Sequence, residues 1–383
     1  MKKYDVIILG AGASGLMCAS NLGKKKSVLI IDANDKVARK LQISGGGKCN
    51  ITNVSVDSEN FDGDSTLINS VLKRFSKESL LNFLERSRVP LEIRKGRYYF
   101  CENSAEDIIE LLKRASKHAE ILLQTKVVKV VKVDKNDELF CVETSKGEFY
   151  AEKVVVATGG KSFANIGASE IGLDIAKSFE LEVKEFTPAL VGLTVQKEQF
   201  WMRELSGLSC YVHIQVGDKL LKEEMLFTHK GISGPAVLSA SLYWKKGLMS
   251  INFIPNLGPF GELKSSAKQL STLLKLPKRL AKTLLVAVGL EDKVGKKLQN
   301  EDLIKLKQLQ SYSFSPAGNF GFTKAEVSRG GVVSEELLSE TLEVKKVKGL
   351  YFIGEVVDIT GELGGYNFQW AFSSAYVCAK AIK

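Results

Sequence analysis

Continuous apolar runs separated by glycine-rich turns organise the start of the chain. Residues 4–9 (YDVIIL) and 27–31 (SVLII) are apolar without alternation, a pattern typical of strands that are buried on both faces of a parallel sheet. The segment LMCASNL, which follows the glycine-rich stretch 10–15, has the periodicity of a helix. The pattern therefore predicts a compact strand–helix–strand unit over residues 4–31.

Helical and strand-like patterns follow in blocks. Amphipathic helices are predicted over 65–86 and 104–118, where apolar positions recur at helical spacing. Strands are predicted between 121 and 157, with turn signals at 134–137 and 145–147. This alternation of helices and strands indicates that the first sheet continues to about residue 157.

The composition changes twice after residue 190. Short strand-like segments (LVGLTV, SCYVHIQV and MSINFI) fill 190–255, and a stretch rich in Lys, Leu, Gln and Ser over 260–311 predicts short helices. Glycine-rich, strand-like sequence then returns after Phe322 and ends in a final helix over about 367–383. The pattern thus predicts a β module followed by a small helical module, between two stretches that mix strands and helices.

Length and composition fit a globular protein of more than one domain. The 383 residues are 44% hydrophobic and 26% charged, which excludes a disordered or fibrous chain. No run approaches the ~18 apolar residues of a membrane-spanning helix, and no signal-peptide pattern is evident, so we expect a cytoplasmic protein without membrane contact. The 54 Lys and Arg against 44 Asp and Glu give a net charge of +10, which favours anionic partners.

The spacing of cysteines and histidines argues against a metal or dithiol centre. The 6 cysteines are far apart and no pair has CxxC spacing, so neither a zinc ribbon nor a dithiol redox pair is expected. The 3 histidines, His118, His213 and His229, are scattered as well. We therefore predict no metal site.

The N-terminal glycine motif carries the strongest chemical signal. Gly10 permits a tight turn from strand to helix, Gly12 lets the backbone approach a pyrophosphate, and Gly15 allows close packing of helix on strand. The start of that helix offers free N–H groups to phosphates. Asp32 ends the second strand, where a carboxylate accepts hydrogen bonds from ribose hydroxyls. Because the motif has all of these parts in order, it predicts a dinucleotide site.

Three further segments are typical of backbone that lies against a ligand. The loop 39–53 (RKLQISGGGKCNITN) holds three consecutive glycines, and 154–160 (VVVATGG) turns sharply after an apolar strand. The segment 349–371 reads as a strand, an acidic turn and a helix that starts at Gly-Gly. Asp358 in that turn is a candidate for binding ligand hydroxyls, and the start of the last helix would stabilise negative charge on a reduced flavin ring.

Together these motifs resemble the three-part layout of FAD-dependent, glutathione-reductase-like flavoproteins. More narrowly, RKLQISGGGKCNITN, LFTHKGISGPAVL and GLYFIGEVVDITGELGGYNFQWAFSSA are similar to the YhiN/BaiN family of flavoproteins, and the resemblance spans nearly the whole chain. It implies an α/β fold, with a Rossmann-like parallel-sheet domain in two sequence segments and an inserted β-barrel with a small helical subdomain. The implied boundaries are 1–190 and 323–383 for the FAD-binding domain, 191–258 and 312–322 for the barrel, and 259–311 for the helical subdomain.

The resemblance also implies which residues bind FAD. Val127 is expected as a backbone contact on the adenine side. The sequence departs from the usual family pattern at 96–101, 162–172 and 327–331, so the family's cofactor carries over more directly than its substrate. The other implied contacts come from the motifs above: Gly10, Gly12, Ser14, Gly15, Asp32, Lys40, Gly45, Gly46, Gly47, Lys48, Cys49, Asn50, Thr158, Gly159, Gly354, Glu355, Asp358, Gly365, Tyr366 and Asn367.

The absence of a second dinucleotide motif and the net positive charge of the chain both bear on the kind of reaction. No second GxGxxG lies between residues 100 and 300, so NAD(P)H would reach the flavin transiently, or another donor would serve. The resemblance implies reduction of activated C=C bonds, either in unsaturated bile-acid intermediates or in uridine of large-subunit ribosomal RNA, and the positive charge favours RNA. A small-molecule oxidoreductase acting on an enone or amine and a non-catalytic flavin-binding protein stay open, and the oligomeric state is not predicted.

Reduction of uracil requires a general acid that protonates C5 after hydride reaches C6. Cys49 is the first candidate because it lies in the loop beside the expected flavin, and Tyr366 and His229 are the others. Cations of the helical segment form a candidate phosphate-binding face. These cations are Lys264, Lys268, Lys275, Lys278, Arg279 and Lys282.

Overall fold

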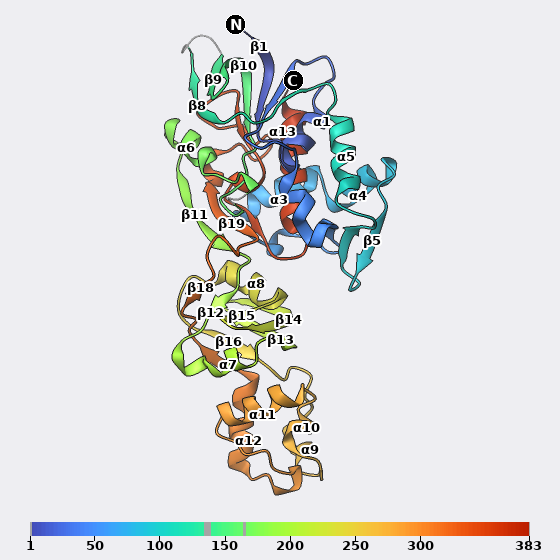
Figure 1. Cartoon of the computed structure of the whole chain (residues 1–383), viewed down its shortest axis with the longest axis vertical. Coiled ribbons are helices and arrows are strands. Elements are labelled where there is room, and N and C mark those ends of the chain that lie inside the picture. The colour runs from blue at the N-terminus through green and yellow to red at the C-terminus, as the bar shows by residue number, and fades with distance from the viewer. Residues whose placement is uncertain (1, 134–138, 164–165, 383) are drawn as a thin grey trace. The chain divides into compact units, whose positions relative to one another are not determined.

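The computed structural model describes residues 2–133, 139–163 and 166–382 (Figure 1). The chain divides into two compact units, of which the first joins Met1–Pro188 to Glu326–Lys383 and the second is Ala189–Ala325. The first unit is therefore built from two sequence segments. The turn predicted at 134–137 lies outside the described residues.

A seven-stranded sheet forms the centre of the first unit. β1 pairs in parallel with β2 and β10, β2 with β7, and β10 with β20, whereas β9 and β8 continue the sheet in antiparallel pairing. The predicted parallel sheet is confirmed, and Ile7 and Ile8, at 0% exposed, explain why the apolar run of β1 does not alternate. The strands are β1 (Lys3–Leu9), β2 (Val28–Ile31), β7 (Glu120–Leu122), β8 (Val127–Lys132), β9 (Phe140–Thr144), β10 (Gly147–Val156) and β20 (Leu350–Phe352).

The last helix of the chain, α13 (Tyr366–Ala381), packs against α1 (Ala13–Asn21) beside this sheet (Figure 1). α13 is buried on nearly every side, so its polar side chains need internal partners. Ser373 Oγ donates to the carbonyl of Phe75 at 2.8 Å, and Ser374 Oγ accepts the Gly354 N–H at 3.0 Å. These bonds attach α13 both to the segment around Phe75 and to the segment after β20.

The remaining elements of the first unit surround the sheet. The stretch 65–86, predicted as helical, is two helices because Asp64 and Ser76 each cap the start of one. The helices are α2 (Arg39–Ile43), α3 (Ser65–Arg74), α4 (Lys77–Arg86), α5 (Glu106–Ala115) and α6 (Ile171–Ser178), with 3₁₀ turns η1 (Ser44–Gly47), η2 (Ser58–Asn60), η7 (Ser334–Glu336) and η8 (Gly354–Val356). The strands are β3 (Asn50–Asn53), β4 (Phe61–Asp62), β5 (Leu91–Arg94), β6 (Tyr98–Cys101), β11 (Val183–Ala189), β19 (Val327–Val332) and β21 (Thr360–Gly361).

The second unit holds a seven-stranded antiparallel sheet of its own, in the order β17-β16-β13-β14-β15-β12-β18. The closed barrel implied by the family resemblance stays a prediction. The strands are β12 (Leu193–Thr194), β13 (Ser209–Val216), β14 (Lys219–Thr228), β15 (Gly231–Ser233), β16 (Met249–Asn252), β17 (Tyr312–Phe314) and β18 (Gly318–Asn319). The helices are α7 (Trp201–Glu204), α8 (Pro235–Tyr243), α9 (Phe260–Leu263), α10 (Leu270–Leu273), α11 (Lys278–Ala287) and α12 (Asn300–Lys307).

Each unit has its own apolar core. The second core joins sheet residues such as Phe227 and Ile251 to Leu280 and Leu284 of α11, so the short helices are packed onto the β module. Across the described ranges, no helix is long and apolar enough to cross a membrane.

Packing of α1 on β1 makes a specific prediction about Gly15. A Cβ at Gly15 would lie 1.9 Å from the carbonyl oxygen of Gly10, whereas a Cβ at Gly12 would meet nothing within 4 Å. Gly15→Ala is therefore expected to lower the free energy of unfolding by about 1–3 kcal/mol or more through overpacking, and Gly12→Ala is the matched control that leaves it near the wild-type value. Urea unfolding followed by circular dichroism measures both, and equal midpoints for the two variants would contradict the close approach.

Candidate functional site

The carboxyl ends of the parallel strands meet at the glycine turn of β1. Gly10 has φ = 110°, and a Cβ there would lie 2.4 Å from the carbonyl oxygen of Ala157 at the end of β10. A Cβ at Gly354, after β20, would lie 2.7 Å from Ser14 Oγ. The structure therefore brings the N-terminal glycine motif, the segment 154–160 and the segment 349–371 together at one edge of the sheet.

The start of α1 is open to a ligand on this edge. Gly12 is its N-cap, and no side chain caps the helix. The positive end of the helix dipole and its unpaired N–H groups suit a pyrophosphate, and the absence of a side chain at Gly12 lets the phosphates approach. The geometry leaves room for this contact, and the role of Gly12 stays a prediction.

Asp32 lies where the second strand ends, as predicted. Its Oδ2 accepts the Ala11 N–H at 2.7 Å and its Oδ1 accepts the Asn34 N–H at 2.8 Å, so the carboxylate is fixed against the glycine turn. The Thr125 N–H donates to the carbonyl of Asp32 at 2.9 Å. The segment that leads to Val127 therefore runs beside Asp32, which is consistent with the predicted adenosine end of the site.

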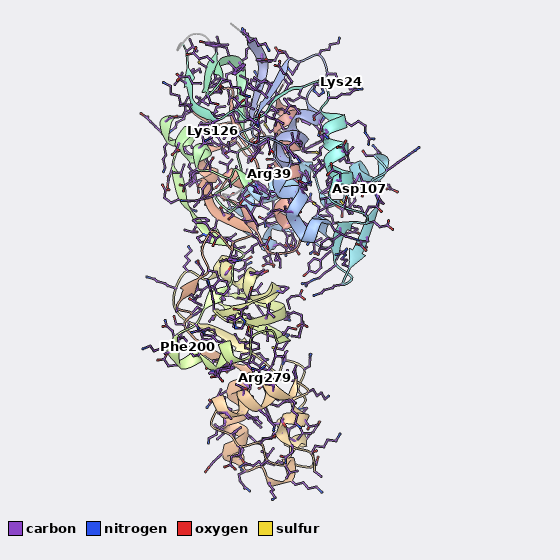
Figure 2. All side chains as sticks on the ribbon, viewed as in Figure 1. Lys24, Arg39, Asp107, Lys126, Phe200 and Arg279 are labelled. Carbon is purple, nitrogen blue, oxygen red and sulfur yellow. The ribbon has the colours of Figure 1, made fainter. Side chains whose placement is uncertain are left out.

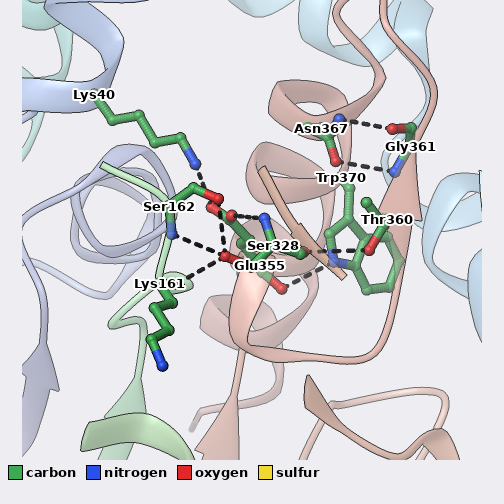
Figure 3. Close-up of polar contacts among 10 residues, drawn as sticks. Lys40, Lys161, Ser162, Ser328, Glu355, Thr360, Gly361, Asn367 and Trp370 are labelled. Carbon is green, nitrogen blue, oxygen red and sulfur yellow. Dashed lines mark hydrogen bonds and ion pairs between the residues drawn. The ribbon is translucent and has the colours of Figure 1, made fainter. Parts of the chain in front are cut away.

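A polar network links four segments that are distant in sequence (Figure 3). Lys40 Nζ of α2 donates to Glu355 Oε2 of η8 at 2.7 Å, and the Ser328 N–H of β19 donates to Glu355 Oε1 at 2.8 Å. Ser328 Oγ in turn accepts the N–H groups of Lys161 and Ser162 at 2.8 and 2.9 Å. Lys40 and Glu355 thus belong to one cluster, and Ser328 is its centre.

The glycine loop after α2 has an unusual backbone. Gly45, Gly46, Gly47 and Cys49 all have positive φ values, between 48° and 85°. A Cβ at Gly46 would meet nothing within 4 Å, so this part of the loop presents bare backbone. Lys48 turns away from it, because its Nζ donates to the carbonyl of Glu102 at 2.8 Å.

The start of α13 lies against β3, the strand that follows this loop. A Cβ at Gly365 would lie 2.6 Å from the backbone nitrogen of Thr52, and Thr52 Oγ1 donates to Gln369 Oε1 at 2.6 Å. Asn367 exchanges two hydrogen bonds, each of 2.9 Å, with the backbone of Gly361. Asn367 therefore fixes the turn that leads into the helix.

Two buried polar atoms at this edge test whether FAD fits. Among the described residues, Asn50 Oδ1, Thr158 Oγ1 and His118 Nε2 are the buried side-chain atoms without a hydrogen-bond partner. Asn50 and Thr158 both belong to predicted FAD motifs. A buried amide oxygen and a buried hydroxyl without partners are costly unless a ligand satisfies them, and the hydroxyl, amide and phosphate groups of FAD have the complementary chemistry. The residues present therefore fit FAD, while the individual contacts stay predictions.

The two predicted proton donors differ in environment. Cys49 is 0% exposed, and burial raises the pKa of its thiol to about 12, with a hydrogen bond from Ser44 opposing the rise. Tyr366 is the first residue of α13 and lies edge-on to Phe61, with ring centroids 5.9 Å apart. Burial raises the pKa of the Tyr366 phenol above its usual range, Glu362 adds to the rise, and Arg97 opposes it.

Two other predicted residues, Asp358 and His229, have different surroundings, and their roles stay predictions. The Asp358 carboxylate pairs with Lys184 Nζ of β11 at 2.5 Å rather than with the Lys40–Glu355 cluster. Burial raises the pKa of Asp358, while Lys184 holds it down. His229 belongs to the second unit, and its role stays a prediction.

Sequence reasoning did not assign a role to Ser328 or to the hairpin residues Arg97 and Tyr98. Ser328 lies in the segment 327–331, whose glycine-rich pattern was a usable signal. Arg97 donates to the Tyr98 hydroxyl beside the start of α13, and only the fold brings these residues near Tyr366.

The fold and this edge of its sheet define a dinucleotide-binding flavoprotein whose binding unit is assembled from two sequence segments. Within that class, the chain belongs to the family described as HI0933-like protein Rossmann domain, whose profile matches residues 4–381. The chain is an FAD-dependent oxidoreductase.

Curated relatives match over their whole length. The chain is 37% identical to a protein of Haemophilus influenzae named ribosomal RNA dihydrouridine synthase, over 100% of this chain and 99% of that protein. It is 28% identical to the 3-dehydro-bile acid delta(4,6)-reductase of Clostridium scindens, over 98% of each. Among solved structures, a quinol-fumarate reductase shares the fold with a TM-score of 0.53 at 13% identity, over 100% of this chain and 71% of that chain.

The raised pKa of Cys49 makes a prediction about its reactivity. An unfolded thiol ionises near a pKa of about 8.5, so between that pH and the folded value of about 12 the unfolded chain releases the proton first and native stability falls as pH rises. At pH 8 we expect iodoacetamide to alkylate native Cys49 at least about a hundredfold more slowly than the urea-unfolded chain. Peptide mass spectrometry measures both rates, and similar rates would show that the thiol is accessible.

Proposed function

We propose that this protein reduces the C5=C6 bond of uridine to dihydrouridine in large-subunit ribosomal RNA. The observation that carries the proposal is the full-length match, at 37% identity, to a relative named for this reaction. The gathering of the predicted FAD motifs at one sheet edge and the net charge of +10 support it. We also propose that the protein works in the cytoplasm.

Bound FAD would supply a carrier that accepts hydride from a donor and releases it to the substrate carbon. The chain would hold it between the start of α1, the glycine loop 45–50 and the start of α13. Lys40, fixed by Glu355, would place a positive charge there, and the dipole of α13 would stabilise negative charge on the reduced ring. Since no second dinucleotide motif is present, NAD(P)H would be a transient electron donor.

Tyr366 is the proton donor that we favour for uridine C5. Burial raises the pKa of its phenol while Arg97 opposes the rise, so the phenol stays protonated at neutral pH and carries a proton that it can donate. Cys49 is the alternative. Its thiol is protonated as well, but it is 0% exposed.

We further propose the domain boundaries implied by the resemblance, with a barrel at 191–258 and 312–322 and a helical subdomain at 259–311. The cations of the helical subdomain, such as Lys275 and Lys282, would bind RNA phosphates.

A second candidate function is reduction of a C=C bond in a small molecule. The relative named as a bile acid reductase favours it, because the match covers 98% of this chain. RNA binding that depends on salt would favour ribosomal RNA over a small neutral substrate.

The proposed function is tested by measuring dihydrouridine in large-subunit ribosomal RNA from cells that lack the gene. Complementation uses the wild type and Gly12→Glu, whose side chain enters the space beside the start of α1. We expect loss of the nucleoside in the deletion and its return with the wild type alone. Unchanged dihydrouridine in the deletion would overturn the proposal.

Tyr366→Phe tests the proton donor. If the phenol protonates C5, turnover falls about 10²- to 10⁴-fold while FAD binding is unchanged. Tyr376→Phe is the matched control, since this residue of the same helix stacks on Phe75 with centroids 4.4 Å apart and keeps its ring. Dihydrouridine formed by purified enzyme on unmodified RNA measures the effect. Full activity of Tyr366→Phe combined with loss in Cys49→Ala would transfer the role to Cys49.

A further inference from the structure

A basic turn lies at the tip of the hairpin formed by β5 and β6. The turn residues Lys95 and Gly96 both have positive φ values, 50° and 68°, and the Arg97 N–H donates to the carbonyl of Arg94 at 3.1 Å, which closes the turn. This geometry gathers three cations, Arg94, Lys95 and Arg97, within four consecutive residues. A turn of this kind fixes their backbone and so reduces the entropy lost when they bind.

The inner face of the hairpin packs against the glycine loop 45–50. β6 pairs with β3, and a Cβ at Gly45 would lie 2.8 Å from Phe100 Cε1, so the Phe100 ring covers the loop. The Arg94 guanidinium lies over that ring at 4.5 Å from its centroid. On the same face, Tyr98 Cε1 would be 3.0 Å from a Cβ at Gly364, just before α13. The basic turn is therefore joined through β6 to the glycine loop and to the segment before α13.

The outer face of the hairpin carries apolar and aromatic side chains. Ile93 and Tyr99 are paired directly across the two strands, and Ile93 is 53% exposed. Tyr99 also lines a groove of about 410 Å³ beside the end of α4. A groove with an aromatic ring, apolar walls and one arginine suits a planar base next to a phosphate. Its lining residues are Leu81, Glu85, Arg88, Val89, Pro90, Leu91 and Tyr99.

The charges on this hairpin favour an anion. Glu92 pairs with Arg94 at 2.5 Å and with Lys48 at 3.4 Å, so one acid is shared by two cations. The groove is lined by one acid, Glu85, and one cation, Arg88. The hairpin 91–101 itself holds three cations and one acid, and its groove adds one of each. The cations of the hairpin and the groove together therefore outnumber their acids. The positive charge of the hairpin and its groove is therefore complementary to the phosphates of a nucleic acid backbone rather than to an uncharged ligand.

We propose that the hairpin 91–101 binds single-stranded RNA, at the nucleotides next to the reacting uridine. The turn cations bind backbone phosphates, and a neighbouring base stacks on Tyr99 in the groove. This inference rests on the proposed function, because it takes ribosomal RNA as the substrate. It assigns the RNA contact nearest to the flavin to the first unit.

The experiment measures binding of a short single-stranded RNA with one uridine to the FAD-loaded full-length protein, over a series of salt concentrations. Lys95→Ala removes one turn cation, so the slope of log K against log salt is expected to fall by about 0.7. Tyr99→Leu removes the stacking ring and is expected to weaken binding about tenfold with an unchanged slope, whereas Tyr99→Phe keeps it.

Matched controls separate this role from general charge and folding effects. Lys24→Ala removes an exposed cation from the turn between α1 and β2, at the opposite edge of the sheet (Figure 2), and is expected to leave both affinity and slope unchanged. The FAD absorbance spectrum confirms that each variant is folded and loaded.

The outcomes distinguish the two proposals. Effects of Lys95→Ala and Tyr99→Leu of the expected kind, with Tyr99→Phe like the wild type, support the hairpin. If the wild type binds and reduces RNA but the hairpin variants match it, the hairpin proposal is overturned and the function stands. If the wild type binds no RNA and the gene deletion leaves dihydrouridine unchanged, the proposed function has failed and the hairpin proposal fails with it.

Discussion

Direct contact of backbone with backbone at the end of β1 is the constraint on which the site depends. A Cβ at Gly10 would strike the carbonyl of Ala157, and a Cβ at Gly15 would strike the carbonyl of Gly10. Because no side chain fits between them, β1, β10 and α1 converge more closely than ordinary packing allows. The start of α1, Thr158 and the residues after β20 therefore share one edge, and a dinucleotide can contact all of them at once.

An ion pair and hydrogen bonds around Glu355 also connect the segments at this edge of the sheet. Glu355 is largely buried, and a buried carboxylate is tolerated when it is paired and hydrogen-bonded. Lys40 supplies the charge and the Ser328 N–H a hydrogen bond, while the Ser328 hydroxyl holds the loop after β10. Loss of one partner would leave the others unsatisfied, so these segments have to order together.

Much of the first unit could be predicted from the sequence, because its signals are local. Unalternating runs such as 4–9 identify buried parallel strands, and the spacing of Gly10, Gly12 and Gly15 identifies the turn. The partner of Asp358 and the centre of the Lys40 network could not be predicted, because both depend on contacts between distant segments. The hairpin 91–101 was missed for a similar reason, since its strands lack clean alternation and are stabilised by β3 and the glycine loop.

The division of the first unit into two sequence segments has a consequence for synthesis of the chain. β20, η8 and α13 all follow residue 349, so the ribosome adds them after the whole second unit has been made. Until then the parallel edge of β10 lacks β20, and Lys40 lacks Glu355. The candidate site is therefore completed late in synthesis, and a nascent chain that stalls early presents an unpaired strand edge that is prone to aggregation.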